Sequence, residues 1–407
     1  MNLRLVFISI FLFGIYSRFH LNAGSLYVPY IFSLLSGTAI FVLNKGRLNA
    51  RSFYFIISIS IISVLVTVIT ILTQNIVAKD VIESLVLFIY SIALSVIFFE
   101  ELLKFSSERL AEYFYKIIVT ILVLCILDIF TPFHELNIFV VDLFGGSNQG
   151  DFTAERESAY FFGIRRPYPF TLEPSHVSKF LLIVISGWLV LSKKKNYKLF
   201  FLIVFLSIVI IRSPILLGSI IVILYYQMSE NAAKKDIRMF SSRLIVVALL
   251  IVATSFFGFI ILEARIKSVI SGGDPSTYIR LFRPYLILYE SLMYSPWIGV
   301  GIANNVKLAE IYALNNKLWL FNDLGSGYTV NALVSPLTYW GIAGTVLHLW
   351  VFISYVFKRV ILDNLLAMLL LTLMISISMG GINTVNFVAY IMIIIRIFTN
   401  QKRHIQT

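Results

Sequence analysis

The chain has 407 residues, of which 59% are hydrophobic and only 13% are charged, and its mean hydropathy is +0.89. Soluble domains are about half apolar and about a quarter charged, so this composition excludes an ordinary soluble enzyme. The net charge of +12 would fit a nucleic-acid-binding protein, but the basic residues cluster at the ends of apolar runs, which is typical of membrane orientation. We therefore expect one integral membrane domain over residues 1–407 and no nucleic-acid partner.

Apolar runs of the roughly 20 residues that cross a bilayer predict an all-α polytopic protein of about twelve transmembrane helices. The first run is interpreted as a retained helix, because Arg18 and His20 stand where a signal peptide would carry small residues for cleavage. Arg212, Ser213 and Pro214 interrupt a pair of short runs, which form either two spans or one broken hairpin. The expected spans are about 3–19, 26–43, 52–72, 81–99, 115–131, 176–192, 198–211, 214–228, 244–262, 331–356, 361–379 and 384–398.

Lys and Arg are concentrated in alternate short connections, which indicates that these connections are cytoplasmic. The opposite short connections contain almost no basic residues beyond Arg18 and Lys79. Both termini are therefore expected in the cytoplasm, and two long segments, about 132–175 and 263–330, fall on the outer side. Loops of this length are usually either functional or disordered, and the Trp, Tyr, Phe, Pro and Gly residues of these two predict packed structure on the outer face of the bundle. The basic residues of the cytoplasmic connections are Lys45, Arg47, Arg51, Lys104, Arg109, Lys116, Lys193, Lys194, Lys195, Lys234, Lys235, Arg238, Arg243, Lys358, Arg359, Lys402 and Arg403.

The densest polar cluster, residues 165–176, ends the first long segment and leads directly into a predicted span. Glu173 precedes a proline, so a helix is expected to begin near Pro174 or Ser175. The polar side chains of this region either anchor and cap the helix at the membrane interface or form a functional site. They are Arg165, Arg166, Tyr168, Glu173, His176 and Lys179.

A second cluster, residues 276–283, precedes an amphipathic stretch of the second long segment. Arg280 and Arg283 are three positions apart, so they share a face if this segment is helical. Two guanidiniums on one face suit a diphosphate, and a solvated basic face is the alternative. Gly299-Val300-Gly301 lacks the third glycine and the strand–helix context of a dinucleotide fingerprint, so it predicts a tight turn.

Two further polar positions lie at the outer ends of spans. The charge of Arg212 either snorkels to the interface or faces an internal cavity, where it would indicate function. Asn331 lies near the start of a span and ten residues before Gly341-Ile342-Ala343-Gly344. A single Asn in such a place is usually a helix cap.

The outer side therefore concentrates arginines beside apolar membrane surface, as an amphiphilic anion would require, with its phosphate on arginine and its tail in lipid. Glu173 is a candidate general base. No P-loop, Asp-x-Asp or His-Glu-x-x-His pattern is present, and the only cysteine, Cys125, lies in an apolar run. No nucleotide site, metal site or cofactor is therefore expected. The five arginines are Arg165, Arg166, Arg212, Arg280 and Arg283.

Three motifs, in order and on one side, resemble the O-antigen polymerase and ligase superfamily. The first is an Arg seven residues before Glu-Pro-Ser at the start of a span, here Arg166 and 173–175. The second is Ser-x-x-x-Arg, here ending at Arg280, followed by Pro-x-x-Gly-x-Gly at 296–301. The third is Asn331 before a helix that contains Gly-x-x-Gly.

The agreement runs from about Cys125 to Phe357. It implies a metal-independent, GT-C-like glycosyltransferase in the bacterial cytoplasmic membrane. Donor and acceptor would be undecaprenyl-diphosphate-linked repeat units on the outer leaflet, transfer would be inverting, and a chain-length regulator would be a further partner. The family's arginines correspond to Arg166, Arg212 and Arg280. Arg165 and Arg283 are supported by their chemistry alone.

Ligases of this superfamily usually carry a His beside the Asn, where this chain has Val330, and this difference favours a polymerase. A ligase that uses His176 as its base is the first alternative, and a flippase for lipid-linked oligosaccharides is the second. Glu173 either activates the acceptor hydroxyl or holds Arg166 by a charge-assisted hydrogen bond, and we favour the second role. The residues expected to bind substrate are Arg165, Arg283, His176, Tyr168, Lys179 and Asn331.

Overall fold

A computed structural model describes residues 3–23, 26–74, 76, 78–145, 160–161, 164–171, 174–233, 283–304, 307–308, 331–357, 359–360 and 364–399. Within these residues the chain is almost entirely helical. Five helices are long and apolar enough to cross a membrane, and others are shorter and equally apolar. These apolar helices confirm the expectation, drawn from composition, of a helical membrane protein.

The helices follow the predicted spans closely, and only the span expected at 244–262 lies outside the described residues. They are α1 (Leu3–Ser17), α2 (Ile31–Leu43), α3 (Ala50–Gln74), α4 (Ala78–Leu103), α5 (Ser107–Phe130), α6 (Phe133–Gly145), α7 (Pro174–Leu191), α8 (Tyr197–Ile211), α9 (Leu217–Ala233), α12 (Arg283–Tyr294), α14 (Ser335–Phe357), α15 (Leu365–Ser378) and α16 (Val385–Phe398), and a 3-10 helix, η3 (Pro214–Leu216), precedes α9. Two antiparallel strand pairs join β1 (Leu21–Ala23) to β2 (Leu26–Val28) and β3 (Tyr160–Phe161) to β4 (Ile164–Arg165).

Three expected boundaries need correction. The span expected from residue 26 begins only at Ile31, because Leu26–Val28 pair with β1 and Tyr30 takes a left-handed conformation with φ of 53°. The span expected from residue 115 begins at Ser107, where the Ser106 side chain accepts the backbone N–H of Arg109 and caps the helix. The long segment expected from residue 132 contains the helix α6.

Two helices, α7 and α16, occupy the centre of the bundle, and nearly all of their residues are buried. Both sequences are largely apolar, which is typical of helices surrounded by other helices. α7 packs against α5, α8, α9 and α16, whereas α16 packs against α4, α15, α7 and α1. Small residues permit the close approach: a Cβ on Gly187 of α7 would lie 2.7 Å from the Phe114 ring of α5.

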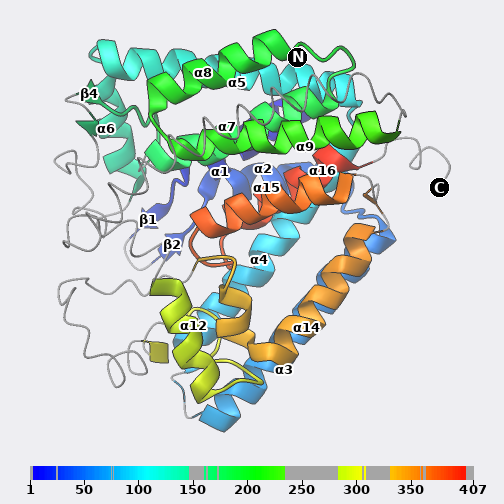
Figure 1. The fold of residues 1–407 in the computed structure, drawn as a ribbon. Coiled ribbons are helices and arrows are strands. Elements are labelled where there is room, and N and C mark those ends of the chain that lie inside the picture. Colours follow the sequence, from blue (N-terminus) through cyan, green and yellow to red (C-terminus); the bar gives the residue numbers. More distant parts are fainter. Residues whose placement is uncertain are drawn as a thin grey trace.

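Figure 1 shows that α3, α12 and α14 form a second group, set apart from α5 and α8 and joined to the rest by α4. α4 packs against α2 and α16 on one side and against α3 on the other, while α14 packs against both α3 and α12. The bundle has two ends. The Glu100 end is where α4 ends and α5 begins, and the Arg165 end is where α5 ends and α7 begins.

At the Glu100 end, oppositely charged side chains form ion pairs. The buried Arg359 donates to Glu100 Oε1 at 3.3 Å and to the Tyr355 hydroxyl at 2.7 Å. Glu101, whose side chain is buried, accepts from Arg4 at 3.0 Å and from Lys104 at 2.8 Å. These contacts join the ends of α1, α4 and α14, and Arg359 also donates to Ser52 of α3 at 3.2 Å.

At the Arg165 end, the turn at residues 295–301 is inserted into a break of α14. Gly299 and Gly301 have positive φ values of 67° and 92°, so the predicted tight turn is confirmed. Gly341 breaks α14 with φ of 60° and ψ of −168°. The backbone groups released by this break bond to the turn: Val300 N–H donates to Thr338 O at 3.0 Å, and Ile342 N–H donates to Pro296 O at 2.8 Å.

Candidate functional site

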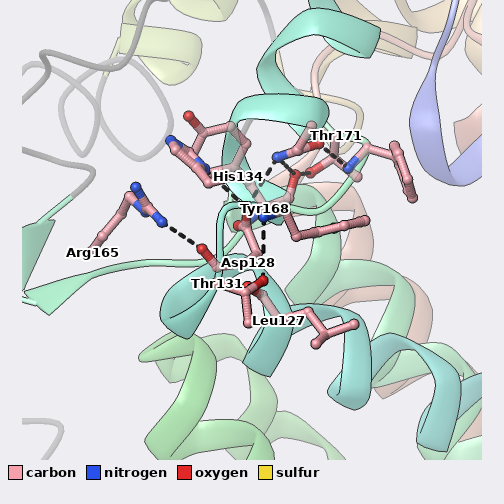
Figure 2. A network of polar contacts seen from close by, with 10 residues as sticks. Leu127, Asp128, Thr131, His134, Arg165, Tyr168 and Thr171 are labelled. Atoms are coloured by element: carbon pink, nitrogen blue, oxygen red, sulfur yellow. Dashed lines mark hydrogen bonds and ion pairs between the residues drawn. The ribbon is translucent and has the colours of Figure 1, made fainter.

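Asp128, in the last turn of α5, organises the polar network drawn in Figure 2. The residue is completely buried. Its Oδ1 accepts from His134 Nδ1 at 2.9 Å and from Asn137 Nδ2 at 3.4 Å, and its Oδ2 accepts from the Tyr168 backbone N–H at 2.9 Å. A buried carboxylate is stable only when hydrogen-bond donors surround it. The three donors of this network therefore hold α6 and the segment at residues 164–171 against the end of α5.

The segment at residues 164–171 is held by its backbone. Asn137 accepts from Phe170 N–H and donates to Tyr168 O, and the Tyr16 hydroxyl of α1 donates to Pro169 O at 2.8 Å. Phe170 has a positive φ of 54°, which is rare for a bulky residue. The arginines of this segment therefore project from a frame built by α1, α5 and α6.

Arg165 and Arg166 each bind a carbonyl at the C-terminal end of a helix. Arg165 Nη2 donates to Asp128 O in α5, as Figure 2 shows, and Arg166 Nε donates to Ile211 O, the last residue of α8, at 3.2 Å. Helix C-termini carry partial negative charge and attract cations. The two guanidiniums are thereby fixed where α5 and α8 end. Arg165 Nε is buried and has no hydrogen-bond partner among the described residues.

Arg212 follows α8 directly. It adopts the left-handed conformation, with φ of 55°, and its backbone N–H donates to Ile208 O at 2.8 Å, so it caps the helix. The carbonyl that receives Arg166 belongs to the preceding residue, Ile211. The structure therefore brings Arg165, Arg166 and Arg212 to one place, although 45 residues separate Arg166 from Ile211 in the sequence.

The polar residues at the start of α7 lie inside the bundle. The helix begins at Pro174, as expected from the sequence. His176 and Lys179 are both buried in its first turns. Tyr168 presents its ring edge-on to His134, with 5.6 Å between the ring centroids. η3, which follows Arg212, packs against α7. The first turns of α7 thus belong to the same end as the arginines.

Two other predicted residues lie elsewhere. Arg283 is buried at the start of α12, which packs on α14 in the second helix group, apart from α5 and α8 (Figure 1). Asn331 Oδ1 accepts from Val334 N–H at 3.2 Å just before α14, as a capping residue does. Glu173 and Arg280 lie outside the described residues.

Sequence reasoning missed Asp128, His134 and Asn137. Asp128 stands within the predicted span 115–131, and an ionisable residue inside a span is by itself an indication of function. This rule would have identified Asp128. His134 and Asn137 carry no such signal, because they lie in a segment expected to be a loop, and only the folding of α6 turns them towards Asp128.

The arrangement combines cations with an oriented imidazole. Because His134 Nδ1 bonds to Asp128, the orientation of the imidazole ring is fixed. An imidazole held in this way by a carboxylate is a common general base. In the described part of the chain, no three His, Cys, Asp or Glu residues lie close enough together to hold a metal ion.

A comparison with models of known protein families found no match for this chain, and neither did a search of curated proteins.

Proposed function

We propose that the chain is a polysaccharide polymerase. It would transfer a glycan from undecaprenyl diphosphate to the end of another lipid-linked repeat unit, as a GT-C-like glycosyltransferase of about twelve spans with both termini in the cytoplasm and the Arg165 end outside. The observation that carries this proposal is the meeting of Arg165, Arg166 and Arg212 at one end of a bundle of apolar helices.

The chemistry of the donor supports this assignment. A guanidinium has five N–H donors in a planar fork. Arg165 uses its Nη2 group for the Asp128 carbonyl, whereas its Nε has no partner among the described residues and could donate to a ligand. Forked donors match the paired oxygens of a diphosphate, and the neighbouring apolar helix surfaces match a polyprenyl tail. A soluble sugar nucleotide would not need the second of these features.

The reaction needs few protein groups. The acceptor hydroxyl oxygen bonds to the anomeric carbon of the donor, the bond from that carbon to the diphosphate oxygen breaks, and the diphosphate leaves with the bonding electron pair. Arginines stabilise the charge that develops on the leaving group, which is usually the largest catalytic contribution. The hydroxyl proton passes to a base, either Glu173 or His134 oriented by Asp128.

The test is the surface polysaccharide of a strain that lacks the gene, complemented with single variants. We expect Arg166→Ala to leave only single-repeat material, and Arg166→Lys to be almost as defective, because an ammonium cannot make a bidentate contact. His134→Gln should reduce chain growth by about a hundredfold if His134 is the base. Arg47→Ala removes an exposed arginine at the Glu100 end and serves as the matched control.

Analysis of the glycans made by the same strains distinguishes the alternative functions. Attached glycan that disappears while lipid-linked polymer stays normal would identify a ligase. Loss of lipid-linked intermediate from the outer leaflet would identify a flippase. Normal polymer length in Arg166→Ala, with the protein present in the membrane, would contradict the proposed arginine site.

A further inference from the structure

Arg18 is a cation whose acceptor is missing from the described part of the chain. It follows α1 in a left-handed conformation with φ of 59°, and its backbone N–H caps the helix by donating to Gly14 O at 3.1 Å. Its half-buried guanidinium has no hydrogen bond or ion pair among the described residues, and its Nε is buried. A guanidinium withdrawn from water without an acceptor costs free energy, so such an arrangement indicates an anionic ligand.

The amide of Asn386 adds a second unused donor. Asn386 lies in the first turn of α16 and is 1% exposed. Its Oδ1 accepts from the Tyr30 hydroxyl at 2.9 Å and from the Phe387 backbone N–H at 3.0 Å. Because a backbone N–H can only donate, the oxygen and nitrogen of this amide cannot be exchanged. Asn386 Nδ2 is therefore turned away from both groups, and it has no hydrogen-bond partner in the described chain.

These groups gather where α1, α2 and α16 meet. The Tyr390 hydroxyl donates to Ile15 O at 3.5 Å, three residues before Arg18, and the ring of His20, two residues after Arg18, lies 5.5 Å from the Tyr30 ring. Tyr30 bonds to Asn386, and Tyr390 lies one helical turn after Asn386 on the same face of α16. Ser17, beside Arg18, is completely buried, and its Oγ also has no partner among the described residues. Three unused donors, one of them charged, are thus collected in one interior region.

The positive charge of Arg18 lies on the side of the membrane where basic residues are unfavourable. With Lys79 and Arg212, Arg18 is one of the few basic residues in the short connections assigned to the outer side. The distribution of Lys and Arg orients membrane proteins, so a cation on that side opposes the topology. Lys79 is exposed and pairs with Glu83, whereas no described carboxylate pairs with Arg18. Helix capping needs only the backbone of residue 18 and does not explain this guanidinium.

We propose that Arg18, Asn386 and Ser17 bind a phosphate group that is carried by a lipid. A forked cation, an amide and a hydroxyl supply donors in several directions, which suits a tetrahedral oxyanion. The surrounding membrane helices favour a lipid as its carrier. The segment at 164–171, which carries Arg165 and Arg166, contacts α1 next to this site, because the Tyr16 hydroxyl, one residue before Ser17, donates to Pro169 O at 2.8 Å.

The identity of that lipid rests on the proposed function. A polymerase that joins two lipid-linked repeat units needs two phosphate sites, and Arg18 would hold one diphosphate while Arg165, Arg166 and Arg212 hold the other. The anion chemistry of the Arg18 site does not depend on the polymerase assignment, so the two proposals can fail separately.

Ligand binding to the purified full chain in a neutral detergent tests the site. The probes are a polyprenyl diphosphate, inorganic diphosphate and phosphatidylglycerol, and the measurements are Kd and the change in Tm. We expect the polyprenyl diphosphate to bind and to raise Tm in the wild type and in Lys79→Ala, the matched loss of a cation. Arg18→Gln should weaken binding by about tenfold or more, because a charge-assisted contact is removed.

Asn386→Asp keeps the test decisive if Arg18→Gln does not fold. The new carboxylate would lie in the region where α1, α2 and α16 meet and, if the site is as proposed, would take the place of the ligand on Arg18. We expect this variant to have a higher Tm than the wild type without any probe, and to lose the further increase that the polyprenyl diphosphate causes. A purely structural Arg18 predicts the opposite, because an additional buried charge would then lower Tm.

The outcomes separate the possible sources of the phosphate. Arg18-dependent binding of phosphatidylglycerol alone would support the phosphate site but assign it to a bilayer lipid and overturn the substrate assignment. Binding of every probe by Arg18→Gln as tightly as by Lys79→Ala would overturn the site, and so would the absence of any binding by the wild type. Arg18-dependent binding by a chain that makes no polymer would contradict the proposed function and leave the site standing.

Discussion

Charged side chains have different kinds of partner at the two ends of the bundle. At the Glu100 end, the carboxylates of Glu100 and Glu101 receive Arg359, Arg4 and Lys104 in ion pairs between side chains. At the Arg165 end, the carboxylate of Asp128 receives an imidazole, an amide and a backbone N–H. Arg165 there donates to a backbone carbonyl, and Arg18 has no acceptor among the described residues.

This difference separates a structural role from a binding role. Where cations and carboxylates form ion pairs with each other, as at the Glu100 end, their charges attract a ligand only weakly. At the Arg165 end, the positive charges of Arg165 and Arg18 face no carboxylate among the described residues, because the carbonyl contact of Arg165 does not neutralise its guanidinium. The Glu100 end therefore holds the helices together, whereas the Arg165 end is suited to an anion.

The largest expected effect of a single substitution concerns the backbone of the Arg165 end. In Gly341→Ala, the new Cβ would lie 2.5 Å from Ile298 N and from Trp297 C, at a residue with φ of 60°. This backbone region is essentially restricted to glycine, and strain and overlap together should cost about 4 kcal/mol. We expect little folded protein, measured as the fraction that stays monodisperse in detergent and as Tm.

A matched alanine substitution makes this comparison specific. Gly380 lies at the same end, opposite Asn331, but a Cβ at Gly380 would have no neighbour within 4 Å. Gly380→Ala should therefore change Tm little. Equal losses in both variants would show that the turn at 295–301 and the break of α14 do not interlock.

Breaking an ion pair at the Glu100 end should have the next largest effect. Glu100→Gln leaves Arg359, which is 4% exposed, without its charged partner. Removing one member of a buried pair usually costs more than the pair contributes, and the partial exposure of Glu100 reduces the expected loss to about 2–3 kcal/mol. Urea or thermal unfolding of Glu100→Gln measures this loss. The double variant with Arg359→Met should recover part of it, and an additive double variant would contradict the ion-pair role.

The smallest expected effect is a pH dependence at the Arg165 end. Burial, assisted by the charge of Arg18, lowers the pKa of His20 to about 4 in the connection between α1 and β1. The unfolded chain then binds a proton from about pH 6.5 downwards while the folded protein does not, so this stability is complete above pH 6.5 and is lost between pH 6.5 and about 4. We expect a loss of about 1–2 kcal/mol after allowance for solvent exposure.

His20→Gln removes this titration and is the control. Its Tm should fall less than the wild-type Tm between pH 7 and pH 4.5. Parallel curves for the two proteins would mean that His20 is protonated as easily in the folded protein as in the unfolded chain.

Much of the helical arrangement follows from hydropathy alone. The start of α7 at Pro174 and the tight turn at Gly299 were predicted, because proline and glycine act on their own neighbours. Asn331 was expected to bind substrate, with a helix cap as the ordinary alternative, and the structure places it as a cap. The β1–β2 pair and the helix α6 were not predicted. Both are short, so contacts with the rest of the bundle decide their conformation more than their own sequence does.

The candidate site was only partly visible in the sequence. Arg165, Arg166 and Arg212 were predicted, since charges that border apolar runs attract attention in a membrane protein. The contact of Arg166 with the end of α8 and the network around Asp128 could not be predicted, because each joins helices that are separate in the chain.

The sequence by itself determined that this is a helical membrane protein and where most of its helices lie, because an apolar run that cannot satisfy its backbone in lipid must form helix. Tertiary structure alone decided which charges meet. Arg359 and Arg18 look alike in the sequence, each near the end of an apolar run, but the fold pairs Arg359 with a carboxylate, whereas no described carboxylate pairs with Arg18. Hydropathy sets the depth of a residue in the membrane, and helix packing sets its neighbours.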